Sequence, residues 1–199
     1  MVIIVGLPGP VTRAYRRLVP VTLRRLVPAD AALLAELYRA NRDFLAPWEP
    51  LRSEDFYTEA YQRIWLADAL DRQAAGSTLP WMIMDDGEPV GRITISDVVR
   101  GAFDSAHLGY WVAGAANGRG IASAAVAEAI RIAFVELGLH RVQAGTLIHN
   151  TGSQKVLARN GFERIGLARS YLRIAGSWQD HLLFQRISDG SLGELTGSN

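Results

Sequence analysis

The chain has 199 residues, 49% hydrophobic and 21% charged, a composition typical of one soluble domain large enough to bury a core. The formal net charge of +1 is too small to attract nucleic acid or a membrane surface, so neither is expected as a partner. Cysteine is absent, which excludes disulfides, thiolate metal sites and a cysteine nucleophile, and is consistent with a cytoplasmic location.

The first part of the chain predicts an irregular extension over residues 1–17, followed by one strand and one helix. A β-prone run over 21–26 indicates the strand. After Pro28, leucines recur at helical spacing, and Asp30 is placed to cap the start of this helix. Pro47 prevents the helix from continuing far past residue 41.

A second helix is expected over 59–75, where Gly76 takes the left-handed conformation that ends it. Helical spacing assigns five residues to its inner face: Tyr61, Ile64, Trp65, Ala69 and Leu70. Two β-prone runs follow, over 81–84 and 90–95, and the Asp-Asp-Gly between them predicts a hairpin.

The second half of the chain alternates strands and helices. Strands are expected over 107–112 and 141–147, and amphipathic helices over 121–137 and 151–159. Residues 162–187 predict two strands joined around Ala175-Gly176-Ser177, and residues 188–199 a loose tail. The order of elements indicates one mixed α/β (α+β) domain over 18–187, built on a central sheet.

A glycine-containing turn, Asn117-Gly118-Arg119-Gly120, leads into the helix over 121–137. Backbone N–H groups that converge at a helix N-terminus can bind an anion, here with help from Arg119. The turn lacks the Lys-Ser/Thr of a P-loop and the third glycine of a dinucleotide fold, so a plain connection is the alternative.

Two other segments are each open to two interpretations. Asn150 and Ser153 begin a predicted helix, where they either cap it or contact an extended ligand, with Ser153 as a proton donor. The aromatic, proline-containing segment 41–50 either packs on the core or forms a binding loop. The four histidines are isolated in the sequence and show no metal-ligand spacing, so no metal is expected.

These pieces resemble the GNAT acetyltransferases. Asn117-Gly-Arg-Gly-Ile-Ala122 is similar to the acetyl-CoA signature Gln/Arg-x-x-Gly-x-Gly/Ala, with Asn in the first place. Asn150-Thr-Gly-Ser153 followed by Asn160-Gly-Phe162 is similar to a second GNAT block. Segments 41–50, 97–101 with 108–110, and 176–181 resemble the RimJ-like branch, the ribosomal-protein-alanine N-acetyltransferases, and the resemblance covers 21–186.

The resemblance implies a GNAT fold, with a mostly antiparallel sheet of about seven strands and about four helices. It also implies acetyl-CoA as cosubstrate, with the pantetheine arm lying between splayed parallel strands over 108–112 and 142–147. Three sets of residues are expected in the site. The cofactor-binding residues are Trp111, Val112, Gly118, Arg119, Gly120, Ile121, Ala122, Ser123, Asn150 and Ser153. The acceptor-binding residues are Asn41, Phe44, Leu45, Trp48 and Glu49.

The catalytic residues implied are Ser153 or Tyr110, as proton donor to the departing thiolate, and Glu49. The proton acceptor for the amine stays open, because Asp104, His107, Asp180 or a water relay could also serve.

The predicted reaction is direct acetyl transfer to the N-terminal α-amine of a protein, an Ala-initiated ribosomal protein. The motivating feature is the segment 41–49, whose acids could meet a positively charged peptide. A small-molecule amine as acceptor and a non-catalytic acyl-CoA-binding module are the alternatives. The protein is expected to be a monomer or a dimer.

Overall fold

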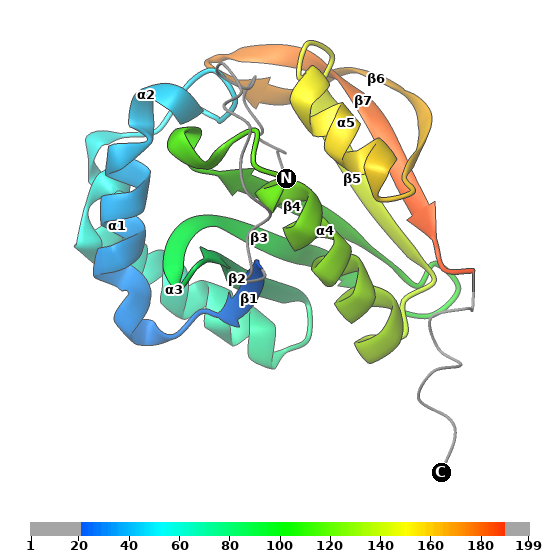
Figure 1. Cartoon of the computed structure of the whole chain (residues 1–199), viewed down its shortest axis with the longest axis horizontal. Coiled ribbons are helices and arrows are strands. Elements are labelled where there is room, and N and C mark those ends of the chain that lie inside the picture. Colours follow the sequence, from blue (N-terminus) through cyan, green and yellow to red (C-terminus); the bar gives the residue numbers. More distant parts are fainter. Residues whose placement is uncertain (1–20, 190–199) are drawn as a thin grey trace.

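A seven-stranded sheet runs through residues 21–189, the part of the chain that this computed structural model describes (Figure 1). The strand order is β1-β2-β3-β4-β5-β7-β6, and only β4 and β5 run parallel. The strands are β1 (Thr22–Arg25), β2 (Thr78–Asp85), β3 (Glu88–Val99), β4 (Ser105–Val112), β5 (Arg141–Leu147), β6 (Glu163–Ile174) and β7 (Ser177–Ile187). The expected mostly antiparallel sheet is therefore confirmed. The predicted extension 1–17 and residues 190–199 of the predicted tail lie outside the described residues.

Helices cover both faces of this sheet. They are α1 (Ala31–Ala40), α2 (Arg42–Leu45), α3 (Glu59–Ala74), α4 (Ile121–Arg131) and α5 (Thr151–Arg159). The helices α4 and α5 pack on one face, where residues such as Ile93, Leu108 and Val126 form the largest core cluster. On the other face, Leu34 of α1 and Leu66 of α3 pack against Met82 of β2. No helix among residues 21–189 is long and apolar enough to cross a membrane.

The inner face predicted for α3 is wrong in part. Ile64 is 74% exposed and Tyr61 is also exposed, whereas Gln62, Leu66 and Ala69 are buried. A polar residue takes the inward position because the Gln62 side-chain amide donates a hydrogen bond to the Phe56 carbonyl at 2.6 Å. A buried amide with such a partner loses little on leaving water, so hydrophobic spacing alone misplaced the face.

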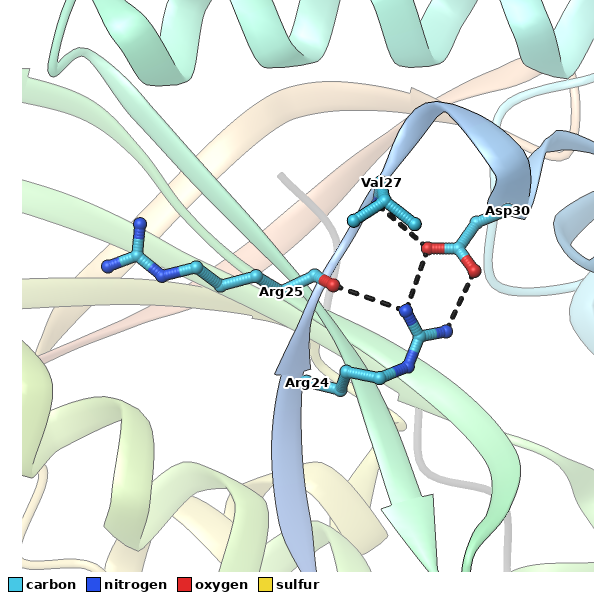
Figure 2. Close-up of polar contacts among 4 residues, drawn as sticks. All are labelled: Arg24, Arg25, Val27 and Asp30. Carbon is cyan, nitrogen blue, oxygen red and sulfur yellow. Dashed lines mark hydrogen bonds and ion pairs between the residues drawn. The ribbon is translucent and has the colours of Figure 1, made fainter.

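Asp30 acts differently from the expected helix cap. Its carboxylate makes no cap hydrogen bond to α1 and instead accepts one from the Val27 N–H at 2.8 Å. The same carboxylate also accepts hydrogen bonds from both terminal nitrogens of Arg24, at 2.8 and 3.0 Å (Figure 2). Burial alone raises the pKa of Asp30, but the hydrogen bonds from Arg24 and Val27 bring the pKa below its ordinary value. The group therefore fixes the turn between β1 and α1.

Two helical segments differ from the expected pattern. The segment 41–50 was expected to be irregular, yet Arg42–Leu45 forms the short helix α2, which ends just before Pro47. The helix expected over 121–137 is α-helical only to Arg131 and continues as a π-helical turn over Ile132–Glu136. This turn buries Ile132, Ala133 and Phe134 in succession, which a regular amphipathic helix would not do.

Candidate active site

The parallel strands β4 and β5 pair only at one end. Ser105, Ala106 and His107 lie opposite Arg141, Val142 and Gln143, and beyond these residues the strands separate. The expected splayed pair of parallel strands is therefore present. An open strand edge offers unpaired main-chain groups to an extended ligand.

The geometry of β3 decides which main-chain groups of β4 face this gap. The Trp111 carbonyl lies against Gly91 of β3, and the Ala113 N–H donates to the Val90 carbonyl at 2.7 Å. Main-chain groups alternate along a strand, so those of Tyr110 and Val112 face the gap. The main chain of Trp111 faces β3 instead, which does not favour the expected contact of Trp111 with a ligand.

The glycine turn after β4 has the shape of an anion site. Gly118 and Gly120 have φ values of +76° and +81°, which a residue with a Cβ rarely adopts. The first hydrogen bond of α4 runs from the Ala124 N–H to the Gly120 carbonyl, so the N–H groups of residues 121–123 precede it. The buried Ser123 hydroxyl has no hydrogen-bond partner among the described residues. These groups together can receive a phosphate.

Arg119 is already engaged by an acid. Its guanidinium contacts the Asp85 carboxylate at 2.8 Å, and Asp85 is buried at the end of β2 while the Arg119 side chain is 42% exposed. This ion pair reduces the positive charge that Arg119 can offer to a second anion. The phosphate contact of Arg119 stays a prediction.

Tyr110 and Ser153 form a buried pair across the gap. The two hydroxyl oxygens are 3.1 Å apart, and the Asn150 side-chain oxygen accepts a hydrogen bond from the Ser153 N–H at 3.0 Å. Burial raises the pKa of Tyr110 far above its ordinary value, and the hydrogen bond with Ser153 offsets this only in part. Tyr110 is therefore protonated at neutral pH and can donate a proton through this pair. Asn150 caps α5, as the capping interpretation predicted.

Three of the five expected acceptor residues are held by contacts within the fold. Asn41 accepts a hydrogen bond from the Gly114 N–H at 2.9 Å and donates one to the Leu37 carbonyl. The Phe44 ring lies directly over Gly114, and Leu45 is buried in a cluster with Tyr38, Phe56 and Trp111. Their contact with an acceptor stays a prediction.

The last two expected acceptor residues lie in different surroundings. The ring of Trp48 packs against that of His149, with 5.4 Å between the ring centres. Glu49 lines a cavity of about 230 Å³. The cavity also touches Gly109 and Tyr110 at the edge of the gap. The Ala175 N–H donates to the Glu49 carbonyl at 2.9 Å, which ties this segment to the β6–β7 hairpin. Burial raises the pKa of Glu49, and Arg52 and Arg92 offset the effect in part. A carboxylate with a raised pKa beside the gap is suited to accept a proton.

The other three base candidates do not line this cavity. Asp104 forms an ion pair with Arg100 at 3.2 Å, before the start of β4. His107 lies where β4 and β5 are still paired, and burial lowers its pKa. The Asp180 carboxylate accepts a hydrogen bond from the Ser170 N–H at 2.8 Å.

The sequence analysis missed two features of the site. Arg52, Arg92 and Arg173 line the same cavity as Glu49, although they come from a loop and two distant strands. His181 of β7 is fully buried next to Gly145, and its Nε2 has no hydrogen-bond partner among the described residues. No spacing in the sequence indicates that the arginines meet, whereas His181 belongs to one of the segments that carried the resemblance.

The sequence of this chain matches a known protein family. Residues 21–163 match the family model described as an acetyltransferase (GNAT) domain. The [Ribosomal protein uS5]-alanine N-acetyltransferase of Escherichia coli is 37% identical over 179 residues, which cover 85% of this chain and 92% of that protein.

Two solved structures are also similar. Mycobacterium smegmatis RimJ in complex with CoA-disulfide is 37% identical, with a TM-score of 0.82, and the match covers 89% of this chain and 85% of that one. The ribosomal-protein-S5-alanine acetyltransferase of Vibrio fischeri is 32% identical, also with a TM-score of 0.82, over 87% of this chain and 96% of that one.

Proposed function

This chain belongs to the GNAT acetyltransferase family, and from that premise we propose that it acetylates the N-terminal α-amine of an Ala-initiated ribosomal protein with acetyl-CoA. It is a GNAT N-acetyltransferase, and the cosubstrate and acceptor are the proposed parts. The names of the E. coli and V. fischeri relatives support a ribosomal acceptor, and the complex of the M. smegmatis relative with CoA-disulfide supports the cosubstrate. A ribosomal acceptor also implies a cytoplasmic location.

The observation that carries the proposal is the open gap between β4 and β5, flanked by a glycine turn on one side and a cavity on the other. The main-chain groups of Tyr110 and Val112 are placed to pair with the pantetheine arm, and the N–H groups of residues 118–123 to hold the pyrophosphate. Asn117 stands where the family signature has Gln or Arg. Its amide donates to the Ala113 carbonyl at 3.2 Å and so braces the turn.

The residues beside the gap can carry out both proton transfers. Acetyl-CoA supplies an activated thioester carbon. Glu49, in the cavity, takes a proton from the incoming ammonium, directly or through a water, because only the neutral amine has a lone pair to attack. The nitrogen attacks the thioester carbon, the C–S bond breaks, and Tyr110 and Ser153 donate a proton to the departing thiolate. The second proton that the nitrogen loses as the amide forms restores this pair through water, and the proton on Glu49 is released to solvent. Tyr110 lines the same cavity as Glu49, so both transfers take place beside one gap.

Incubation with acetyl-CoA and a panel of peptides tests the proposal. Peptides that begin with Ala should be acetylated at the α-amine and should release an equal amount of CoA, whereas the same peptides with a blocked N-terminus should not react. Turnover of small amines alone would contradict the proposed acceptor. Tight binding of acetyl-CoA with no product from any amine would indicate a non-catalytic module.

A further inference from the structure

The cavity beside Glu49 carries more positive than negative charge, and this bears on the acceptor of the proposed function. Three arginines, Arg52, Arg92 and Arg173, line it, and Glu49 is its one acidic residue. Arg52 is partly engaged, because its Nε lies 3.4 Å from the Glu49 carboxylate. The acids of segment 41–49 were expected to attract a positively charged peptide. The arginines that line this cavity instead favour a negatively charged group.

Arg92 is held in place by aromatic rings rather than by an acid. Its guanidinium lies 4.3 Å from the centre of the Trp65 ring and 5.7 Å from that of Tyr38. Stacking on a ring fixes the plane of a guanidinium while leaving its N–H donors at the edge available. Among residues 21–189, Arg92 forms no ion pair within 4 Å.

Arg173 is held by the hairpin that closes the cavity. Its Nε donates to the Gly176 carbonyl at 3.1 Å, across the β6–β7 turn. Gly176 in turn lies against Leu51, next to the segment that carries Glu49. In the described part of the chain Arg173 likewise has no acidic partner within 4 Å, so its terminal nitrogens are available to a ligand.

We propose that Arg92 and Arg173 select an acceptor that carries a carboxylate close to its reacting amine. Each guanidinium presents a fork of N–H donors that matches a carboxylate, and hydrogen bonds between charged groups are the stronger ones. The carboxylate belongs either to an Asp or Glu side chain near a protein N-terminus or to the free carboxyl of a small amino compound. The same charge disfavours Lys-rich peptides and polyamines. This inference rests on the proposed N-acetyltransferase function.

Matched peptides test this selection. A series Ala-Gly-X, Ala-X-Gly and Ala-Gly-Gly-X, each extended by the same neutral sequence and amidated at its end, is assayed with X as Glu, Gln or Lys. In at least one position the Glu peptide should have a kcat/KM about tenfold or more above the Gln peptide, with the Lys peptide lowest. Equal kcat/KM values for Glu, Gln and Lys at every position would overturn the inference and leave the proposed function intact.

A second arm separates the two sources of the carboxylate. Free alanine and the dipeptide Ala-Gly are compared with their amides. If no peptide is acetylated but these free acids are, the proposed protein acceptor fails and the carboxylate selection stands. If no amine of either kind is acetylated, both fail.

Variants of the two arginines test whether these side chains cause the preference for a carboxylate. Arg92→Gln, Arg173→Gln and the double variant should each reduce the ratio of kcat/KM between Glu and Lys peptides, mainly through KM. Arg63→Gln on the exposed face of α3 is the control and should keep the wild-type ratio. Thermal unfolding checks that Arg92→Gln, which loses a stacking contact, is still folded. A ratio unchanged in the folded double variant would contradict the assignment.

Discussion

In the proposed reaction, Tyr110 and Ser153 protonate the departing thiolate. Both are buried, and burial keeps the pKa of Tyr110 high, so this group holds its proton over the whole neutral range. The pair can therefore act as one proton-donating unit rather than as two independent acids.

Removal of either hydroxyl should slow the reaction. Tyr110→Phe and Ser153→Ala should each lower kcat by about 10²- to 10⁴-fold, the usual contribution of a positioned acid, with little change in the affinity for acetyl-CoA. The double variant should be little worse than the single ones, because the two hydroxyls act together. Steady-state kinetics with calorimetry of acetyl-CoA binding measures both, and Tyr61→Phe on exposed α3 is the control. Full activity of Tyr110→Phe would remove it from the mechanism.

Glu49 gives a prediction that depends on pH. A base acts when deprotonated, so kcat/KM should rise with pH through the raised pKa of Glu49. Glu49→Gln should lower the rate and abolish this acidic limb, while any limb due to the amine itself should remain. A pH profile of kcat/KM for wild type and variant measures the effect. If the limb assigned to Glu49 persists unchanged in Glu49→Gln, another group is the one that titrates.

The same substitution should affect stability with a defined sign. A carboxyl whose pKa is raised in the folded state binds its proton more tightly there than in the unfolded chain. The stability that this protonated carboxyl contributes is present below its pKa in the unfolded chain, and it is lost as the pH rises through its pKa in the folded protein. Glu49→Gln should therefore gain stability relative to wild type on going from acidic to neutral pH, so reduced activity at neutral pH would not reflect unfolding.

At the scale of the elements, the turn between β1 and α1 depends on Asp30. Asp30→Asn should lower the free energy of unfolding by about 1–3 kcal/mol at neutral pH, the size of hydrogen bonds to a charged group, because it weakens the contacts with Arg24 and Val27. Because the pKa of Asp30 is depressed, its stabilisation is present above the unfolded pKa and is lost as pH falls through the folded pKa. Urea unfolding at several pH values should show the difference shrinking in acid. Asp68→Asn on the exposed face of α3 is the control.

The β3–β4 pair should not tolerate a side chain at Gly91. A Cβ there would lie 2.2 Å from the Trp111 carbonyl oxygen and 3.0 Å from the Val112 Cα, both backbone atoms that cannot rotate away. Gly91→Ala should cost about 1–3 kcal/mol of stability and weaken acetyl-CoA binding, because the displaced edge of β4 lines the gap. Gly166→Ala in β6 is the matched control, since a Cβ there meets no atom within 4 Å. Wild-type affinity in a folded Gly91→Ala protein would contradict the role given to this edge.

Local sequence determines the elements but not which residues meet between them. The bounds of β5 and α5 were predicted to the residue, because a short run between a helix-ending glycine and a helix-capping asparagine, and a capped amphipathic segment, are local patterns. The face of α3 was partly missed, because the buried Gln62 amide donates its hydrogen bond to the Phe56 carbonyl, which lies in a separate segment. Asp30 was misassigned for the same reason, since its partner Arg24 lies in β1.

At the scale of the whole molecule, the seven-stranded sheet brings together groups that are far apart in sequence. Glu49, Arg92 and Arg173 come from a loop after α2, from β3 and from β6, and all three line one cavity. The hydrogen bond from Ala175 to the Glu49 carbonyl ties the β6–β7 hairpin to the loop. From its residues the glycine turn was either an anion site or a plain connection, and only the resemblance to the GNAT family favoured the anion site. The cavity beside Glu49 could not be predicted, because its charge depends on three segments whose separation along the chain carries no pattern.

The most direct test of the proposed acceptor is a mass-spectrometric comparison of protein N-termini in cells with and without this gene. We expect that loss of the gene removes the acetyl group from an Ala-initiated ribosomal protein, and that wild-type protein restores it whereas Tyr110→Phe does not. Identical N-terminal acetylation of all ribosomal proteins in both cell types would contradict the account.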